Sequence, residues 1–202
     1  MVTRMTRSLL YVPRMYTREE LLMITPQIPP DLDAKTAEFW KYVEEKIAPF
    51  VGKAKAVYHD MVHVSGDEGL KLISTLDEQC YPIVRKLTEG GAMVQATEDV
   101  ALLSEAESWV GIMRDPRNRG ALELFVENLK ERNRHISETV EKTLQEGETG
   151  VIFIEPSRQI TFPKDITVIR VCPFEPTDYV NGMLARQRVE KRQPTTAETS
   201  KE

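Results

Sequence analysis

A chain of 202 residues, of which 41% are hydrophobic, is long enough to form one domain with a substantial core. Its 27 basic and 32 acidic side chains give a net charge of −5, which disfavours any general attraction to nucleic acids or anionic membranes. No apolar run approaches the roughly 20 residues that a membrane span requires, and none resembles the apolar core of a signal peptide. We therefore expect a cytoplasmic protein that binds neither nucleic acid nor membrane.

The composition predicts one domain followed by a charged C-terminal tail. The sequence contains no internal repeat and no change of composition that marks a second domain. From about Arg186 onward the residues are charged and include almost no large apolar side chain, so they cannot offset the entropy of becoming ordered. We predict a single α/β domain over residues 1–185 and a mobile tail over residues 186–202.

The two cysteines, Cys80 and Cys172, lie far apart and have the spacing of neither a metal site nor a redox motif. Such a pair is more typical of a reducing compartment than of an oxidising one. We expect both residues to be free thiols.

Five short apolar runs alternate along the chain with segments of helical periodicity. Most of the runs are continuous rather than strictly alternating, as in a parallel sheet whose two faces are both covered by helices. We predict a strand at each run, over residues 8–12, 54–58, 92–96, 151–154 and 166–171. This order predicts a three-layer α/β/α sandwich with a mostly parallel sheet of about five strands.

Helix starts are marked by capping signals. Thr17 with Glu20 and Ser65 with Glu68 have the S/T-x-x-E spacing of a capping box, directly after the first and second strands. Pro82 lies inside a helical pattern that covers residues 66–89, so we expect that helix to kink or break there.

One long helix is predicted before the fourth strand. Asp115 and Pro116 mark its start, with Asp as the cap and Pro at the first helical position, and Gly147 ends it. Asn133 interrupts its apolar stripe, and two interpretations of this residue stay open. It is either a boundary residue whose amide is satisfied by water or backbone, or a residue directed toward a site. The stripe itself consists of Leu122, Val126, Leu129, Ile136, Val140 and Leu144.

Polar side chains follow the predicted strands at the points where the strands end. The carboxyl ends of parallel strands meet at one edge of a sheet, and open α/β sheets bind their ligands there. The same inventory is expected of any solvent-facing loop edge. The residues are Arg14, Tyr16, His59, Asp60, His63, Glu98, Asp99, Glu155, Ser157 and Arg158.

Three of these residues, Asp60, Glu98 and Glu155, are candidate catalytic groups because carboxyl groups can act as general acids or bases. Glu98 and Asp99 also fit an ordinary helix N-terminus, which favours negative charge. Ser157 has neither a G-x-S-x-G motif nor a recognisable histidine partner, so the sequence argues against a hydrolase triad.

The histidines His59 and His63 have an i, i+4 spacing that resembles a metal-binding motif, but no Glu follows the first of them. We therefore predict no metal and no cofactor. In the alternative, His59, His63, Asp60 and Glu98 would be the metal ligands.

Several sequence blocks together resemble a known family. They are LYVP at 10–13, KAVYHD at 55–60, GAMVQATED at 91–99, ERNRHISETVEKTLQEGETGVIFIEPSR at 131–158 and FPKDITVI at 162–169. These blocks resemble an uncharacterised prokaryotic α/β family that is distantly similar to the TraB-like and Tiki-like superfamily. The resemblance implies an α/β sheet protein. Its better-preserved relatives place a His after the first strand, an Arg-Asp pair in the long helix and a His after the GETG strand.

This chain departs from that pattern at three positions. Tyr16, Asn133 and Arg158 stand where the resemblance implies a His, an Asp and a His, whereas Arg132 keeps the arginine of the pair. A phenol and a guanidinium in place of two imidazoles remove the usual nitrogen ligands of a divalent metal, and Arg158 adds a permanent cation. The chain therefore resembles a degenerate member of the family.

We expect a small-anion-binding protein or pseudoenzyme that uses the carboxyl edge of the sheet, with Arg14 and Arg158 on the anion. The remaining ligand-binding candidates are Tyr16, His59, Asp60, Glu98, Arg132, Asn133 and Ser157. Two alternatives stay open. One is a hydrolase that uses Asp or Glu side chains as acid and base, and the other is a structural or partner-binding subunit in which the long helix forms a homodimer.

Overall fold

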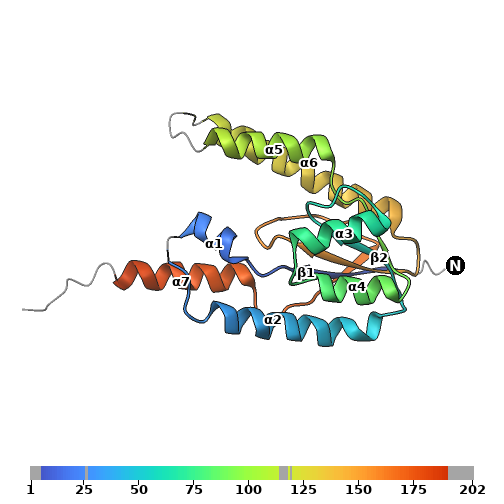
Figure 1. Ribbon diagram of the computed structural model, residues 1–202. Helices are drawn as coiled ribbons and strands as arrows, with labels where there is room; N and C mark the ends of the chain where they lie inside the picture. Colours follow the sequence, from blue (N-terminus) through green and yellow to red (C-terminus); the bar gives the residue numbers. More distant parts are fainter. Residues whose placement is uncertain (1–5, 26, 114–117, 119, 191–202) are drawn as a thin grey trace, which may run out of the picture.

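The computed structural model of the protein describes residues 6–25, 27–113, 118 and 120–190 (Figure 1). Five strands form one sheet in the order β3-β2-β4-β1-β5, and every neighbouring pair is parallel. The strands are β1 (Arg7–Pro13), β2 (Ala54–His59), β3 (Met93–Val94), β4 (Thr149–Ile154) and β5 (Ile166–Arg170). All five predicted strands are present, but β3 is shorter than the predicted 92–96 segment.

Helices cover both faces of this sheet, so the predicted α/β/α sandwich is confirmed. The helices are α1 (Arg18–Ile24), α2 (Leu32–Ile47), the short 3-10 helix η1 (Ala48–Phe50), α3 (Gly66–Leu76), α4 (Tyr81–Glu89), α5 (Val100–Met113), α6 (Gly120–Thr143) and α7 (Pro176–Glu190).

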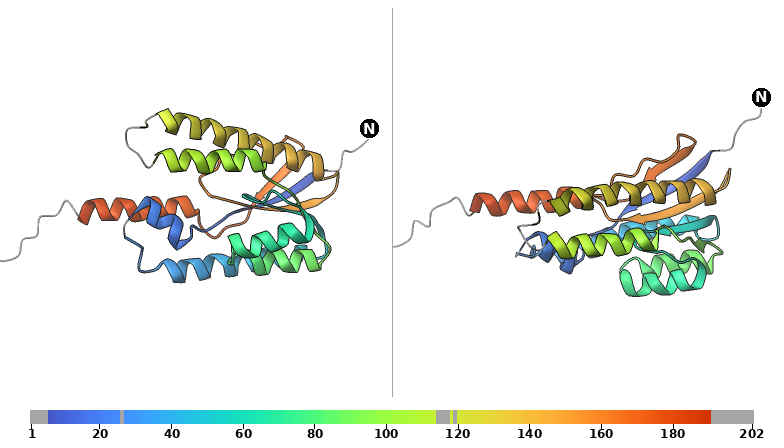
Figure 2. Two further views of the ribbon diagram at one scale, coloured as in Figure 1. Left: turned by 45° about the horizontal axis from the view of Figure 1, so that its top comes forward. Right: turned by 90° about the horizontal axis from the view of Figure 1, so that it is seen from above.

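Alternate residues of each central strand enter two separate cores. Leu10 and Val12 of β1 pack on the face covered by α2, α3, α4 and α7. Leu9 and Tyr11 pack on the opposite face, with Ile136 and Val140 of α6 and Leu144, the residue directly after that helix. Figure 2 shows these layers, with α5 and α6 side by side on one face of the sheet and α2, α3 and α4 on the other. This packing explains why the strands are apolar on both faces.

One of the two predicted capping boxes forms. Thr17 accepts a hydrogen bond from the amide of Glu20, and the Glu20 carboxylate accepts one from the amide of Thr17, so α1 starts as predicted. For Ser65, the predicted helix start is correct but the predicted side-chain cap is wrong. Helix α3 does begin directly after Ser65, but the serine side chain makes no cap and its Oγ instead accepts a hydrogen bond from the amide of Ala96, at 3.0 Å.

Pro82 separates two helices, as expected of a residue that cannot donate within a helix. Helix α3 ends at Leu76 and α4 begins at Tyr81, with Pro82 in its first turn. The long predicted helix corresponds to α6, which ends at Thr143, before the left-handed Gly147 (φ 79°). Its predicted start at residues 115 and 116 lies outside the described residues.

The apolar stripe of α6 is buried over only part of its length. Ile136, Val140 and Leu144 are fully buried, but Leu122 is 58% exposed and Val126 is 42% exposed. The reason is visible in Figure 1, where the hairpin formed by α5 and α6 extends past the edge of the sheet.

The predicted mobile tail begins within a helix, because α7 continues to Glu190. Residues 191–202 lie outside the described residues, and the mobility of the tail stays a prediction. The prediction for Cys80 and Cys172 is confirmed, since both are free cysteines. No described helix has the length and apolar character needed to cross a membrane.

The strand order creates a switch point between β2 and β4. From β2 the chain moves to β3 at one edge, and from β4 it moves to β5 at the other edge. The segment after β2 packs in the α3 and α4 layer, whereas Ile160 and Phe162 after β4 pack against the opposite core. Neighbouring loops therefore separate at this point, which is where open α/β sheets bind ligands.

Candidate functional site

A pocket of about 280 Å³ lies at this switch point. Strand ends supply most of its polar wall, and α6 adds Arg132. The residues predicted at the strand ends that line it are Arg14, His59, Asp60, Glu155, Ser157 and Arg158. The sequence therefore identified much of the pocket wall.

Asp60 joins three strand ends at the floor of the pocket. Its backbone amide donates to the carbonyl of Phe153 at 3.1 Å, and its Oδ2 accepts a hydrogen bond from the amide of Glu155 at 2.8 Å. Its Oδ1 accepts from Nε of Arg14, also at 3.1 Å. Burial alone would raise the pKa of Asp60, but the charges of Arg14 and Arg158 and the amide of Glu155 outweigh it and lower that pKa. Asp60 is therefore an ionised structural anion.

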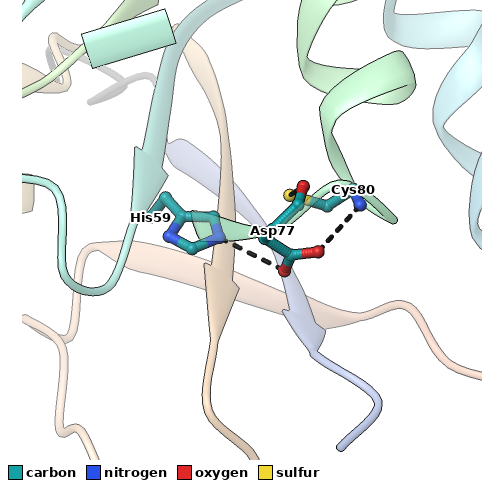
Figure 3. Close-up of side chains that lie close together, drawn as sticks. All are labelled: His59, Asp77 and Cys80. Atoms are coloured by element: carbon teal, nitrogen blue, oxygen red, sulfur yellow. Dashed lines mark hydrogen bonds and ion pairs between the residues drawn. The ribbon is translucent and has the colours of Figure 1, made fainter. Parts of the chain in front are cut away.

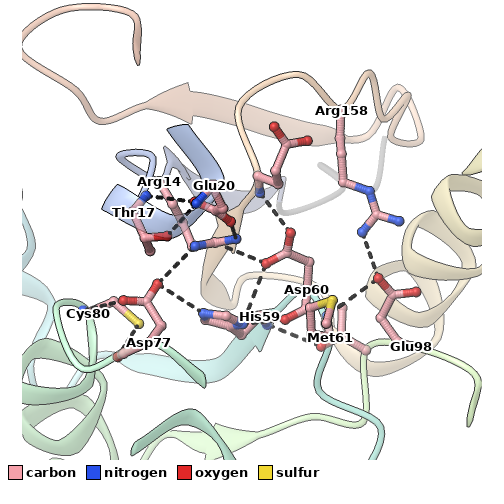
Figure 4. A network of polar contacts seen from close by, with 12 residues as sticks. Arg14, Thr17, Glu20, His59, Asp60, Met61, Asp77, Cys80, Glu98 and Arg158 are labelled. Atoms are coloured by element: carbon pink, nitrogen blue, oxygen red, sulfur yellow. Dashed lines mark hydrogen bonds and ion pairs between the residues drawn. The ribbon is translucent and has the colours of Figure 1, made fainter. Parts of the chain in front are cut away.

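Arg14 links Asp60 to a second buried carboxylate, Asp77, in the turn between α3 and α4. Its Nη1 lies 3.3 Å from Oδ2 of Asp77, and its Nη2 lies 3.5 Å from Oε1 of Glu20. Burial raises the pKa of Asp77, but the hydrogen bond to His59 and the charge of Arg14 together lower it to about 2. Figure 4 shows Arg14 between the two carboxylates. Its guanidinium is thus already occupied by protein groups.

His59, Asp77 and Cys80 form a cluster of metal-binding side-chain types, whose ligand atoms lie within 4.8 Å of one another (Figure 3). Zinc binds all three types. Here the groups satisfy each other instead. Nε2 of His59 lies 3.4 Å from Oδ2 of Asp77, Nδ1 of His59 contacts the carbonyl of Asp60, and the Cys80 thiol donates to the carbonyl of Asp77.

A metal would have to replace this network. The Asp77 oxygen nearest to His59 also accepts from Arg14, a permanent cation, and the other accepts from the amide of Cys80 at 3.0 Å. Burial raises the pKa of the Cys80 thiol well above its usual range, which opposes the thiolate that a metal needs. The arrangement therefore fits a buried hydrogen-bond network better than a metal site.

Glu98 is the centre of a second buried ion-pair network. Nε of Arg132 donates to Oε2 of Glu98 at 3.0 Å and Nη2 of Arg132 donates to Oε1 at 2.6 Å, so the pair is bidentate. Nη1 of Arg158 donates to the same Oε1 at 2.6 Å. Among the described residues, Glu98 is the sole carboxylate paired with either arginine. Two guanidinium groups therefore share one negative charge.

Two neighbouring donors of the Arg158 guanidinium, Nε and Nη2, have no acceptor among the described residues, and we call this side of the group its open edge. The Arg158 side chain is only 3% exposed, and both donors are buried. Buried donors without acceptors are costly and rare in folded proteins. In Figure 4, Arg158 reaches down to Glu98 from the end of β4, and the residue also lines the pocket. This edge is the part of the site best placed to bind an acceptor.

Met61 has an unusual backbone at the rim of the pocket. Its φ is 71°, and it is the only described residue other than glycine with a positive φ. Its amide lies 3.4 Å from Oε1 of Glu98, and its Sδ lies 3.9 Å from Nη2 of Arg132. Backbone strain of this kind clusters at functional sites, because the surrounding contacts have to impose it.

The remaining sequence candidates occupy different places. Tyr16 lines two neighbouring hollows but not this pocket, and Asn133 lies at a separate small pocket beside Ser137, where its Nδ2 donates to the carbonyl of Gln159. The Oγ of Ser157 donates to Glu155. The structure therefore does not bring Tyr16 and Asn133 to the open edge of Arg158.

The histidine pair and the acidic pair also separate. His59 is buried, whereas His63 is exposed, so the two do not form one ligand set. Asp99 accepts hydrogen bonds from the amides of Ala101 and Leu102 and caps α5, while Glu98 points to the arginines. The capping interpretation thus holds for Asp99 alone.

Sequence reasoning missed Asp77 and Cys80. A signal for Asp77 was present, since it lies at the break that Pro82 predicted in the helical pattern, but nothing local shows that this turn folds under Arg14. Comparison of the chain with models of protein families, with curated proteins and with solved structures gave no match. The resemblance to the TraB-like and Tiki-like superfamily therefore rests on the sequence blocks alone.

Proposed function

We propose that this protein binds a small carboxylate ligand at the carboxyl edge of the sheet, with Arg158 as its anchor. The observation that carries the proposal is the open edge of the Arg158 guanidinium, whose Nε and Nη2 are buried and lack an acceptor among the described residues. These two N–H groups point in parallel from one edge of the planar group and match the two oxygens of a carboxylate.

The neighbouring pair supplies a template for this contact. Arg132 uses the same two atoms, Nε and Nη2, to hold the carboxylate of Glu98 at 3.0 and 2.6 Å. A ligand carboxylate would repeat that geometry on Arg158 and balance the second of the two guanidinium charges around Glu98. The carboxylates of Asp60 and Glu155, which line the same pocket, repel an anion, so Arg158 is the group that favours its negative charge.

A binding protein or pseudoenzyme is favoured over a hydrolase by the state of the candidate catalytic acids. Asp60 is held ionised by Arg14, and both oxygens of Glu98 accept from arginines. A general acid at neutral pH needs a raised pKa, whereas the pKa of Asp60 is lowered. Glu155 accepts from the amide and hydroxyl of Ser157. No acid–base pair with separated pKa values follows from these contacts.

Calorimetric titration with sodium acetate in a chloride buffer tests the proposal. We expect saturable binding, and Arg158→Met should weaken it about 10- to 100-fold, the loss typical of hydrogen bonds to charged groups. The fold should survive because Glu98 stays paired with Arg132. Arg158→Lys should also bind more weakly, since an ammonium lacks the planar fork. Arg134→Met is the matched control, because Arg134 is an exposed α6 residue outside the pocket. Equal binding by wild type and Arg158→Met would exclude the proposal.

A second proposal concerns the α5 and α6 hairpin. The exposed half of the apolar stripe, with Leu122 at 58% and Val126 at 42%, favours a homodimer through the long helix. Light scattering of wild type and of the Leu122→Glu, Val126→Glu double variant tests it. We expect a dimer and a monomer respectively, and a monomeric wild type would contradict the proposal.

The two free thiols favour the reducing cytoplasm as the site of this protein.

A further inference from the structure

The Arg158 pocket continues into a larger groove of about 660 Å³. This groove lies between α1 and the hairpin of α5 and α6, and its surface is largely apolar. The apolar side chains that matter for the argument are Met23 of α1, Leu103, Ala106 and Val110 of α5, and Phe125 of α6. Its volume is within the range of cavities that bind small molecules.

The two cavities share part of their walls. Five residues line both of them: Glu20, Met61, Phe125, Arg132 and Glu155. A ligand anchored at Arg158 can therefore extend past Met61 and Phe125 into the groove without leaving the protein surface. The junction is where Met61 holds its left-handed backbone.

The charges of the groove restrict what can enter it. The charged groups among the described residues that line it are the carboxylates of Glu20, Glu107 and Glu155 and the guanidinium of Arg132, which Glu98 already holds in a bidentate pair. A second anionic group on the ligand would face these carboxylates, with no open cation among the described residues that line the groove. The groove therefore favours a chain that is uncharged beyond its first carboxylate.

We infer that the ligand is a monocarboxylate with an apolar chain, bound with its carboxylate on Arg158 and its chain in the groove. This inference rests on the proposed carboxylate site and specifies its ligand class. The hydrophobic effect then supplies most of the affinity, because each buried methylene adds a roughly constant increment.

A series of sodium alkanoates from acetate to octanoate, titrated below micelle-forming concentrations, tests the inference. We expect the dissociation constant to fall about fourfold for each added methylene. Suberate, the dicarboxylate of the same length as octanoate, should bind more weakly than octanoate because its second carboxylate faces Glu20 and Glu107. Octyltrimethylammonium should not compete, since its head group is a cation.

A groove-filling variant locates the chain. Gly111 of α5 lines the groove, and a Cβ placed there meets no described atom within 4 Å, so Gly111→Phe introduces a ring from an open position of the groove wall. In this variant the gain in affinity per added methylene should disappear for all but the shortest alkanoates. Gly182→Phe is the matched control, because Gly182 of α7 is equally open and lines neither cavity, and it should keep the full gain.

The outcomes separate the two proposals. Acetate binding that depends on Arg158 but does not strengthen with chain length would overturn this inference and leave the carboxylate site standing. A chain-length gain that persists in Gly111→Phe, or octyltrimethylammonium binding equal to that of octanoate, would also overturn it. Acetate binding that is equally strong in wild type and in Arg158→Met would exclude the proposed carboxylate site itself.

Discussion

The carboxylate of Asp60 accepts a hydrogen bond from the backbone amide of Glu155 at 2.8 Å, which ties the end of β2 to the end of β4. These two strands are neighbours on either side of the switch point. The same carboxylate holds Arg14 at the end of β1. One buried side chain thus connects three strand ends, in addition to the backbone hydrogen bonds from Arg14 to Ile154 and from Asp60 to Phe153.

Asp60→Ala should lower the free energy of unfolding by about 3 kcal/mol, because it removes one partner from the buried Arg14 and one from the half-buried amide of Glu155. Urea unfolding measures this loss. Arg134→Ala, which removes two exposed ion pairs on α6, should change the midpoint little. Equal effects of the two variants would show that Asp60 does not organise the strand ends.

Asp77 should make the protein sensitive to acid. Its pKa in the folded state is lowered to about 2, so its stabilising contribution is present above the unfolded pKa of 3.8 and is lost as the pH falls through about 2. The contribution is on the order of 2 kcal/mol, and Asp77→Asn should remove most of it at pH 6. Urea unfolding from pH 6 to pH 2 should show a shallower decline for the variant than for wild type. Parallel declines would contradict the assignment.

Much of the fold was predictable because its signals are local. Each apolar run became a strand, and Thr17 and Pro82 marked a helix start and a helix break as expected. The capping prediction failed at Ser65 because its side chain accepts a hydrogen bond from the distant amide of Ala96 instead of one from its own helix. The long apolar stripe predicted burial over its whole length, and this was wrong at Leu122 because no local pattern shows that the sheet ends before that residue.

For the candidate site, the sequence predicted which residues lie at the sheet edge but not how they pair. Parallel strand ends had to bring Arg14, Asp60 and Arg158 to one edge, and they do. Which carboxylate pairs with which arginine is set by the packing of distant segments, so Glu98 could equally have been a helix cap. Asp77 belongs to a turn between helices, and no strand-end rule points to it. The open edge of Arg158 is a three-dimensional property that has no sequence signal.

Gly69→Ala should destabilise the fold by about 1–3 kcal/mol. A Cβ at this position would lie 2.5 Å from the carbonyl oxygen of Val64 and 2.8 Å from Cγ1 of Val94, so α3 would have to move away from the end of the sheet. Gly182→Ala is the control, since its Cβ meets nothing within 4 Å and Ala favours a helix. Thermal unfolding should rank Gly69→Ala clearly below wild type and Gly182→Ala at or slightly above it. The reverse order would contradict the packing of α3.

The most direct test of the central claim follows the Nε–H resonance of Arg158 by NMR during a titration with sodium acetate. The resonance is assigned by its loss in Arg158→Lys, and Nε–H of Arg7, which is paired with Asp165 at 3.0 Å outside the pocket, is the internal reference. A new charge-assisted hydrogen bond should move the Arg158 resonance saturably while that of Arg7 stays in place. An Arg158 resonance that remains fixed at saturating acetate would contradict the proposed carboxylate site.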